Sequence, residues 1–380
     1  MLNIELVDSI EAIGASTWQG LLQSRYPFGQ FGFLQALEQT GCVGSASGWL
    51  PQHLVVRNPS QQIIACAPLY LKQHSWGEYI FDWAWAEAFQ RAGRPYYPKL
   101  VAAIPFTPAW GPRLFGQLPK DELLYVQQWL EQHSDHKQLS SLHWLLPEAA
   151  ASAQLSARWA QRETAQFHWF NHDFQDFSEF LATFNARKRK SLLRERRKVF
   201  EQGVTLVRKC GADISAADWR VFYHCYHTTY LKRSGRAGYL NFDFFQRLGE
   251  VMPDQLMMVL AQRDQETIAA ALCFFDDQTL YGRYWGCLEE VECLHFEACY
   301  YQGIEFAIER GLTRFDPGAQ GEHKIQRGFE PVAVYSNHYI KDADARAAIN
   351  HFIAEERNQT QSYLNAARDL LPFKQAQQPS

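Results

Sequence analysis

The sequence lacks the loops that hold phosphates and the turn that presents a serine nucleophile. It contains no G-x-x-x-x-G-K-[ST] loop, no G-x-G-x-x-G turn and no G-x-S-x-G motif. In each of these motifs, glycines let the backbone approach a phosphate or turn sharply enough to expose a serine. The sequence therefore gives no positive indication of a nucleotide triphosphatase, a dinucleotide-dependent enzyme or a serine hydrolase.

Long apolar runs are also missing. No apolar run approaches the ~20 residues that a membrane-spanning helix needs. The first residues, Met1 to Asp8, do not show the basic and then apolar pattern of a secretory signal peptide. We therefore expect a cytoplasmic protein without a transmembrane segment.

Cysteine pairs with metal-binding spacing are absent, although the chain has eight cysteines. Cys287, Cys293 and Cys299 recur every six residues, whereas structural zinc sites use pairs about two to four residues apart. The scattered spacing is not that of a small disulfide scaffold either, so we expect reduced thiols. We predict no metal site and no tightly bound cofactor.

The chain has enough residues and enough apolar side chains for two packed domains. Its 380 residues exceed what one hydrophobic core usually serves. Its composition, 47% hydrophobic and 14% aromatic, excludes a disordered protein. The Ala-, Ser- and Gln-rich segment 149–154 is the best candidate for a linker. We predict an N-terminal domain at 1–155 and a C-terminal domain at 156–380, which ends in a helix at 343–368 and a frayed tail at 375–380.

The two halves repeat one order of predicted elements. Val55 and Val259 are 204 positions apart, and so are Ile64 and Ile268, which lie in the second strand of each predicted hairpin. An aromatic third strand, a helix and a closing strand follow in each half. The third strands are predicted at 79–83 and 280–285, the helices at 122–132 and 297–310, and the closing strands at 142–145 and 313–316. Symmetry over so long a span indicates duplicated domains and not a solenoid of short repeats.

Charged side chains gather after the last of these strands. Asp316, His323 and Lys324 bring an acid, an imidazole and an ammonium group together within nine residues. Pro317 ends the strand, and Gly321 frees the backbone for a tight turn. Ligands of open α/β sheets bind beyond the carboxyl ends of strands, so this segment is the leading candidate for a site. The alternative is a polar loop that only connects two elements.

A basic segment at 185–200 carries eight Lys and Arg residues and one acid, in a chain of net charge −4. Four of the bases recur at the spacing of one helical face: Arg187, Lys190, Arg194 and Arg197. Leu192, Val199 and Phe200 are predicted to face the core. Such a stripe suits phosphates of a nucleotide cofactor, an RNA backbone or a phosphorylated carrier, although a merely solvated helix fits the pattern equally well.

Three further groups of residues are candidates. The start of the helix at 297–310 places His295 and Glu297 beside a strand end, where either can act as a general base. A glutamate in a first helical turn more often serves the helix dipole. Tyr284 belongs to a set of phenols in the second half that can donate a proton to a leaving group. A polar and aromatic cluster of the first half can line a cleft between the domains: Tyr97, Lys99 and Arg113.

Five segments together carry a resemblance to a known family. They are Tyr79–Ala84 (YIFDWA), Tyr96–Leu100 (YYPKL), Pro105–Pro108 (PFTP), Asn185–Lys190 (NARKRK) and Phe315–Lys324 (FDPGAQGEHK). Over nearly its full length the chain resembles the FemAB-like predicted N-acyltransferases, labelled in many bacteria as peptidoglycan biosynthesis or recognition proteins. The resemblance implies a tandem pair of GNAT-like (acyl-CoA N-acyltransferase) α/β domains with mixed, mostly antiparallel central sheets, which agrees with the duplication.

The resemblance also implies an activity. Fem enzymes move an amino acid from aminoacyl-tRNA to an amine of the peptidoglycan precursor, and they use a lysine in a K-x-x-x-G-F-like context. Lys324, followed by Gly328 and Phe329, looks like that lysine. The chain departs from several Fem enzymes in having no coiled-coil arm for tRNA, and the acetyl-CoA signature R-x-x-G-x-G/A is absent too. Acetyl-CoA, another acyl-CoA and aminoacyl-tRNA therefore all stay open as donor co-substrates.

We therefore expect direct transfer of an acyl or aminoacyl group to an amine acceptor such as a peptidoglycan precursor. Lys324, expected to be exposed beyond the turn, would stabilise the oxyanion or hold an anionic group of the acceptor. Asp316 or His323 would move the proton, and the basic helix would hold donor phosphates. The alternative is a non-catalytic module that binds a cell-wall precursor or RNA through the same stripe.

Overall fold

The computed structural model describes residues 2–319 and 321–374. Gln320, inside the charged segment, and the predicted tail at 375–380 lie outside the described residues. The chain forms two compact units: one comprises Met1–Ala165 and Ala333–Ser362, and the other comprises Gln166–Val332 and Tyr363–Ser380. These units differ from the expected domains, 1–155 and 156–380, because the chain re-enters the first unit after Val332.

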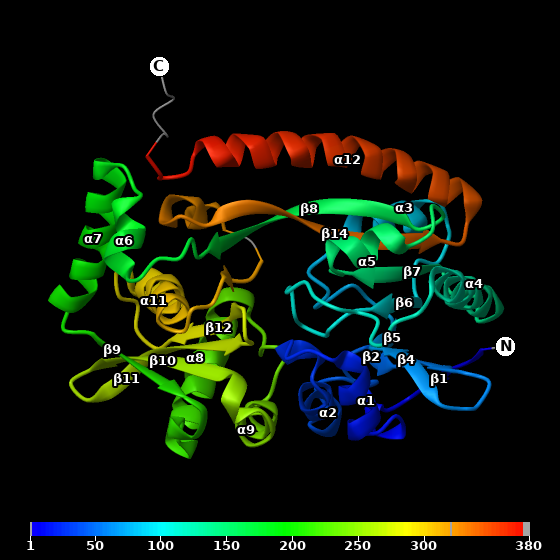
Figure 1. Ribbon diagram of the computed structural model, residues 1–380, viewed down its shortest axis with the longest axis horizontal. Helices are drawn as coiled ribbons and strands as arrows, with labels where there is room; N and C mark the ends of the chain where they lie inside the picture. Colours follow the sequence, from blue (N-terminus) through cyan, green and yellow to red (C-terminus); the bar gives the residue numbers. More distant parts are fainter. Residues whose placement is uncertain (1, 320, 375–380) are drawn as a thin grey trace. The chain divides into compact units, whose positions relative to one another are not determined.

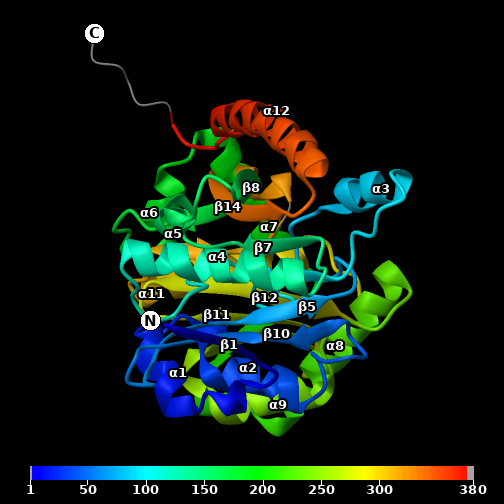
Figure 2. The same ribbon diagram turned by 90° about the vertical axis from the view of Figure 1, so that its right-hand side faces the viewer.

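The first unit consists of short strands with α4 on one face and α1 and α2 on the other (Figures 1 and 2). Its strands are β1 (Asn3–Val7), β2 (Trp49–Pro51), β3 (His53–Arg57), β4 (Ile63–Ala67), β5 (Leu69–Lys72), β6 (Lys99–Ala102) and β7 (Ser141–Leu145). Its helices are α1 (Ala15–Leu22), α2 (Phe31–Gln39), α3 (Trp83–Arg91), α4 (Lys120–His136) and α5 (Ala149–Gln154). The chain passes between the units within β8 (Ala160–Phe170), β14 (Glu330–Ile340) and α12 (Ala343–Asp369).

A proline divides the strands of this unit. β1, β3 and β4 pair antiparallel in the order β1-β3-β4, whereas β5 pairs with β2 and β6. Pro68 separates β4 from β5, and it interrupts the ladder because it has no N–H to donate. β6 and β7 run parallel, since α4 carries the chain back between them, and β7 also pairs with β14.

Side chains of alternate strand positions bury one face of the first unit against α4. Residues two apart on a strand point to the same face, and residues four apart on a helix share a stripe. The buried cluster contains, among others, Leu54, Val56, Leu100, Ala102, Val126 and Leu130. Removing this apolar surface from water, at about 25 cal/mol per Å², holds the helix on the strands.

Most strands of the second unit are longer than those of the first. They are β9 (Thr205–Cys210), β10 (Leu256–Arg263), β11 (Glu266–Phe275), β12 (Thr279–Cys287) and β13 (Arg314–Asp316). Its helices are α6 (Phe177–Ala182), α7 (Ala186–Glu201), α8 (Ala216–Ser234), α9 (Phe242–Val251), α10 (Leu294–Phe296) and α11 (Gln302–Glu309), with a π-helical turn at Glu297–Tyr301 and a 3-10 helix at Glu322–Arg327.

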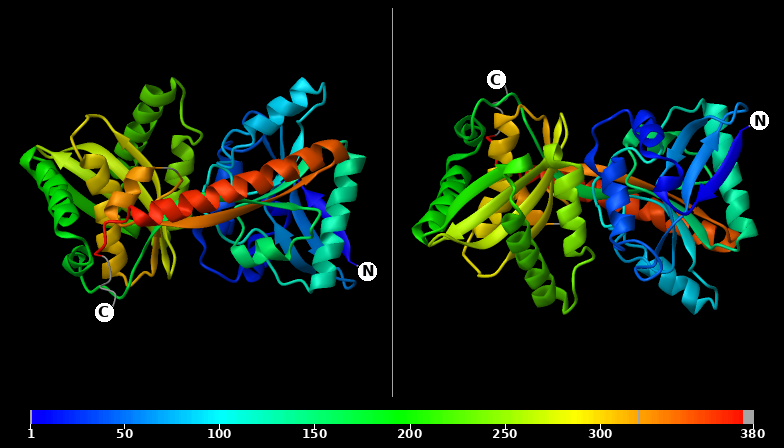
Figure 3. Two further views of the ribbon diagram at one scale, coloured as in Figure 1. Left: turned by 90° about the horizontal axis from the view of Figure 1, so that it is seen from above. Right: turned by 90° about the horizontal axis from the view of Figure 1, so that it is seen from below.

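The strands of the second unit follow the order β8-β13-β12-β11-β10-β9 and are antiparallel except for β12 and β13. α8 and α9 cover one face and α11 covers the other (Figure 3). α8 crosses β12 very closely: a Cβ at Gly286 would lie 2.1 Å from the backbone of Cys225. Only glycine permits this approach. On the opposite face, Tyr301, Ile304 and Ile308 are buried, as their spacing along one side of the helix predicted at 297–310 indicates.

The two units repeat one topology. The hairpin β3–β4 corresponds to β10–β11, and the parallel pair β6–β7, joined through α4, corresponds to β12–β13, joined through the π-helical turn and α11. Val55 and Val259 lie in the first strand of their hairpins, where they pair with Cys66 and Ala271. The internal repeat predicted from the sequence is therefore confirmed in the topology.

One predicted strand is wrong. Residues 79–83 form no strand, because Tyr79 has a φ of 60° and α3 begins at Trp83. A positive φ takes the backbone out of the extended region. The buried face of this helix comes from Trp85 and Phe89, which lie four residues apart, whereas Phe81 and Trp83 of the predicted strand are 51% and 40% exposed. The matching segment 280–285 of the second unit does form part of β12.

The longer predicted helices are present. Those expected at 122–132, 185–200 and 343–368 correspond to α4, α7 and α12, while the expected linker 149–154 forms α5. Asn185 begins α7 by accepting a hydrogen bond from the Lys188 N–H. In the described part of the chain, none of the helices is both long and apolar enough to cross a membrane.

Candidate active site

A small pocket opens where β12 and β13 stop pairing. The two strands run side by side over Thr279–Tyr281 and Arg314–Asp316. Gly282 comes next, and a Cβ there would lie 3.2 Å from the Phe315 ring and 3.4 Å from the Pro317 Cα. The pocket has a volume of about 100 Å³ and is lined by Ala271, Leu272, Cys273, Gly282, Arg283, Tyr284, Trp285, His295, Cys299, Tyr300 and Pro317.

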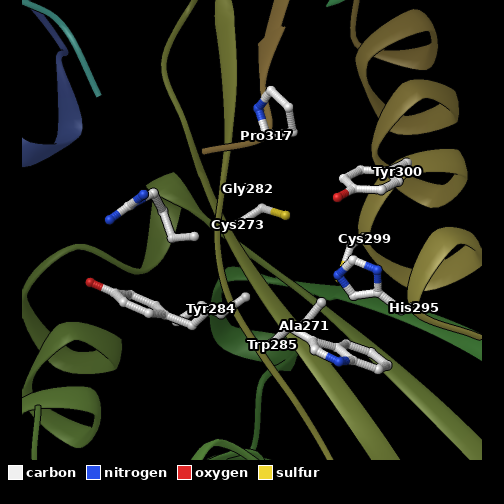
Figure 4. Close-up of a pocket in the computed structure, with 11 residues that line it drawn as sticks. Ala271, Cys273, Gly282, Tyr284, Trp285, His295, Cys299, Tyr300 and Pro317 are labelled. Carbon is white, nitrogen blue, oxygen red and sulfur yellow. The ribbon is translucent and has the colours of Figure 1, made fainter. Parts of the chain in front are cut away.

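Strands supply one wall of the pocket and the helical segment after β12 supplies the other. His295 and Tyr300 face Cys273 and Gly282, with Pro317 at one end (Figure 4). Cys299 and Tyr300 belong to the π-helical turn. Such turns are rare and often occur at functional sites, because the wider turn changes the direction in which side chains point.

Lys324 is tied to the end of β13. Its Nζ donates a hydrogen bond of 2.6 Å to the Gly318 carbonyl, and the Gly318 N–H donates one of 2.9 Å to Asp316 Oδ1. Gly318 has a φ of 88°, which favours glycine. Gly328 and Phe329 complete the loop: the Phe329 ring packs 5.3 Å from the Tyr300 ring and fixes the loop against the pocket wall.

The structure corrects the expectation that Lys324 is exposed, because only 2% of its surface is accessible. Burial lowers the pKa of Lys324 to about 8, and the nearby Asp316 carboxylate opposes this shift. Cys299 and Arg283, two pocket residues, also act on it electrostatically. Lys324 is therefore a buried cation whose ammonium group is bonded to Gly318, the residue that follows Pro317 of the pocket.

His168 of β8 lies beside the same acid. Its Nε2 is 3.6 Å from Asp316 Oδ1, and both side chains are buried. Burial lowers the pKa of His168 to about 4, so the imidazole is neutral near pH 7. The other carboxylate oxygen of Asp316, Oδ2, is buried and has no hydrogen-bond partner among the described residues.

His323 pairs with a pocket phenol. Its Nε2 lies 2.8 Å from the Tyr300 hydroxyl, and burial lowers the pKa of His323. Burial also raises the pKa of Tyr300, so this phenol stays protonated. His295 forms part of the same wall, and its pKa is lowered to about 3 by burial. The wall thus presents neutral groups that can accept or donate a proton.

Glu297 does not line the pocket. Its carboxylate is fully buried and accepts hydrogen bonds from Arg196 at 2.8 and 2.9 Å and from Gln302 at 2.8 Å. A carboxylate held in a buried ion pair is not available as a base for a substrate. Glu297 therefore has a structural role as the partner of Arg196, and we do not propose it as the general base.

The basic stripe lies outside the pocket. Arg187, Lys190, Arg194 and Arg197 are exposed on α7, and none of them is among the pocket residues. Leu192 and Val199 are buried as expected. Phe200, which we predicted to face the core, is 50% exposed, because it lies on the flank of the helix that turns to solvent.

The candidate site residues of the first unit form hydrogen bonds with other residues of that unit. Lys99 is buried and donates to Ser75 and Glu78 at 2.8 Å and to Asp82 at 2.5 Å. The Tyr97 hydroxyl lies 2.9 Å from the same serine oxygen. The buried Arg113 donates to backbone carbonyls, including that of Leu145 at 2.8 Å. Tyr284, in contrast, does line the pocket of the second unit.

Several pocket residues carry no signal in the sequence. Cys273, Arg283 and Cys299 were not singled out as site residues, because no local motif distinguishes them. Gly282 had a signal that could have found it: an isolated glycine inside a strand often marks close approach of another backbone or a ligand.

Comparisons with known proteins agree with this architecture. The model of the FemAB-like family, described as peptidoglycan biosynthesis/recognition, matches residues 9–375. FemX is similar in structure with a TM-score of 0.51 at 11% identity, covering 92% of this chain and 100% of that one. A conserved protein of unknown function from Bacteroides thetaiotaomicron has a TM-score of 0.53 at 11% identity, covering 88% and 99%. L-PGS from Bacillus licheniformis has a TM-score of 0.50 at 12% identity, covering 84% and 96%.

A search of curated proteins gives no match. The family model nevertheless spans nearly the whole chain, and the two units repeat one mixed, mostly antiparallel sheet topology in which one pair of strands is parallel. The fold is the tandem pair of GNAT-like domains that the family resemblance implies. The chain belongs to the FemAB-like family.

Proposed function

We propose that this protein is an N-acyltransferase that moves an acyl or aminoacyl group from an ester or thioester donor to an amine. The observation that supports this most is the buried Lys324, held by the Gly318 carbonyl behind a pocket at the divergence of β12 and β13. A desolvated cation beside a small pocket is suited to a reaction in which negative charge develops on a carbonyl oxygen.

In the proposed reaction the amine nitrogen attacks the donor carbonyl and forms a C–N bond. The resulting oxyanion collapses, and the C–O or C–S bond to the donor breaks. One N–H of Lys324 already donates to Gly318, and an ammonium group has two more to offer to the oxyanion or to an anionic group of the acceptor. Placement of the two substrates supplies a large part of the rate enhancement.

Protons move through the groups at the same strand end. Asp316 has a buried oxygen without a hydrogen-bond partner among the described residues, and His323, whose pKa burial lowers, is ready to accept a proton near pH 7. Tyr300, paired with His323 at 2.8 Å, is placed to donate a proton to the departing alcohol or thiol. We assign proton transfer and orientation to this group of residues.

The donor is proposed to be acetyl-CoA, another acyl-CoA or aminoacyl-tRNA, and the acceptor an amine of a peptidoglycan precursor. The family description and the likeness to FemX support the acceptor class. No tightly bound cofactor is part of the proposal, because the chemistry requires only placement, a cation and proton transfer.

A thermal-shift panel followed by a turnover assay tests the proposal. A ligand present at 100 times its dissociation constant adds roughly 2.7 kcal/mol to the free energy of unfolding. The panel contains acetyl-CoA, charged and uncharged tRNA, and peptidoglycan precursors, and mass spectrometry then detects the new amide. Stabilisation by a donor and a precursor together with amide formation is the expected result. Binding of a precursor or RNA without amide formation from any donor would instead identify a non-catalytic binding module.

A further inference from the structure

The outer face of α7 carries charge that the pocket does not use. Four cations on this face are exposed to solvent: Arg187, Lys190, Arg194 and Arg197. Within residues 2–319 and 321–374, the first three have no ion-pair partner. Arg197 lies 3.7 Å from Glu201 on the same helix. Because the whole chain has a net charge of −4, this basic stripe is a local feature of one helix.

The inner face of α7 already supplies the contacts that hold the helix in place. Arg196 forms the buried ion pair with Glu297, and Glu195 accepts a hydrogen bond of 2.8 Å from Arg327. Leu192 is buried in the core cluster of the second unit. Figures 1 and 3 show α7 at the margin of this unit. The fold therefore does not need the outward cations.

Two large apolar side chains flank the basic stripe. Leu193 is 49% exposed and Phe200 is 50% exposed. They lie seven residues apart, so they share one side of the helix and are separated by roughly 10 Å along its axis. Lys190 and Arg197 lie three residues before them on the neighbouring flank. Apolar groups of this size remain exposed at some cost, which makes their combination with exposed cations informative.

We propose that α7 docks this protein on the surface of an anionic lipid bilayer. The cations meet the phosphates of the headgroups, and Leu193 and Phe200 enter the boundary between headgroups and acyl chains. Charge complementarity attracts the helix to any polyanion. The exposed leucine and phenylalanine favour the bilayer, since a soluble phosphate or an RNA backbone offers a leucine no apolar environment. The docking is separate from the proposed acyl transfer and does not depend on it.

Co-sedimentation of the full chain with vesicles tests the docking. One set of vesicles contains equal amounts of phosphatidylglycerol and phosphatidylcholine, and the other contains phosphatidylcholine alone. We expect salt-sensitive binding to the anionic vesicles and little binding to the neutral ones. Changing the four cations of the stripe to Gln lowers the affinity by more than about ten-fold. The double change L193N and F200N lowers it by about three- to ten-fold, because the apolar contacts are lost.

Matched variants separate this surface from general electrostatics. Exposed cations on other parts of the chain are changed to Gln as the charge control: Arg91, Lys120, Lys137 and Arg220. Exposed leucines on other helices are changed to Asn as the apolar control: Leu124 and Leu231, which are 41% and 45% exposed. Both controls retain binding to anionic vesicles. Melting curves identify any variant that does not fold, and the single changes R194Q and F200N then replace it, each with a smaller loss in the same direction.

Binding of unfractionated tRNA is measured in parallel. The proposal is overturned if anionic vesicles are not bound, if the charge control loses as much affinity as the stripe variant, or if L193N with F200N binds vesicles as the parent does. In the last case, loss of tRNA binding in the stripe variant assigns the surface to RNA. Loss of vesicle binding in L193N with F200N, at unchanged tRNA binding, supports the membrane.

Discussion

Lys324 combines two properties that rarely occur together in a lysine: it is a cation, and it is almost fully buried. Its ammonium group has the Gly318 carbonyl as a partner and the Asp316 carboxylate nearby, which offset part of the cost of burial. Residues whose charge is buried at such a desolvation cost are frequently functional. A desolvated charge interacts more strongly with a substrate than an exposed charge does.

Replacing Lys324 by Met separates the effect of its charge from the effect of its packing. The variant keeps most of the buried volume and loses the ammonium group, so we expect acyl transfer to fall by about 10² to 10³ while the protein still folds. Lys324→Ala loses the same activity and is less stable than Lys324→Met, because it leaves a cavity. Transfer rates and urea unfolding curves measure the two effects. Transfer at the parental rate by the Met variant would move the central role to Asp316 or His323.

The pKa of Lys324 predicts the pH dependence of both activity and stability. Its folded value is about 8 and its ordinary value is 10.5. Activity that needs the ammonium form falls as the pH rises through about 8. Between pH 8 and 10.5 the unfolded chain binds more protons at this residue than the folded chain does, so the contribution of Lys324 to stability rises with pH in this window. Difference measurements against Lys324→Met isolate both trends, and identical pH profiles for the two proteins would contradict them.

Tyr300 offers a milder test of the pocket wall. Tyr300→Phe removes the hydroxyl that lies 2.8 Å from His323 and leaves the ring in place. We expect transfer to fall by about 10² if this phenol donates the proton to the leaving group. The loss should be smaller for a donor whose leaving group is a better one. A small loss of transfer rate that is equal for all donors would show that the hydroxyl only orients His323.

At the scale of elements, α7 has two faces with different tasks. Its inner face joins the π-helical turn through the ion pair of Arg196 and Glu297, while its outer face carries the basic stripe. A single run of Lys and Arg in the sequence therefore divides into cations with partners on other segments, such as Arg196, and a set of exposed ones. The local sequence does not distinguish them, because both kinds are arginines within one helical turn.

Arg196→Ala and Arg197→Ala test this division on adjacent residues. Arg196→Ala leaves the fully buried Glu297 without its cation, so we expect a loss of about 3 to 5 kcal/mol in the free energy of unfolding. Arg197→Ala removes an exposed side chain and should change stability by less than about 0.5 kcal/mol. Chemical denaturation of the two variants provides the comparison. Equal losses would mean that the buried pair does not hold α7 in place.

At the scale of the whole molecule, each unit contains segments from distant parts of the chain. β14 pairs with β7 over Ser336–Ile340, and the buried Ser336, Asn337 and His338 lie in that strand. His338 also contacts His143 of β7 at 2.6 Å. The first unit is thus complete only when the chain has returned from the second.

This arrangement predicts the behaviour of a fragment that ends at the boundary expected from the sequence. Residues 1–155 lack β14, which leaves the edge of β7 and its buried polar side chains uncovered. We expect the fragment to aggregate or to unfold without a cooperative transition. Circular dichroism during heating, with the full chain as control, measures this. A soluble fragment with a sharp transition would show that the first unit does not depend on its returning strand.

Much of the architecture follows from the sequence, and the reason is that local patterns determine local structure. The helices predicted at 122–132, 185–200, 297–310 and 343–368 correspond to α4, α7, the π-helical turn with α11, and α12. The common offset of Val55 and Val259 revealed the repeated hairpin. The chain segment from Asp316 to Lys324 was recognised as the candidate site because turn residues and charged residues follow a strand end. These features depend on residues that are close in the sequence.

Only the tertiary structure decided where long side chains end and which strands complete each unit. Lys324 is buried and not exposed, Glu297 is held by Arg196, and Phe200 faces solvent, although neighbouring residues in the sequence are compatible with either placement. The pocket brings Cys273 together with Tyr300 from another element, and β14 returns to a unit that began with β1. Burial, pKa shifts and pairing between distant strands arise from packing, so the sequence determines the elements and the packed chain determines their chemistry.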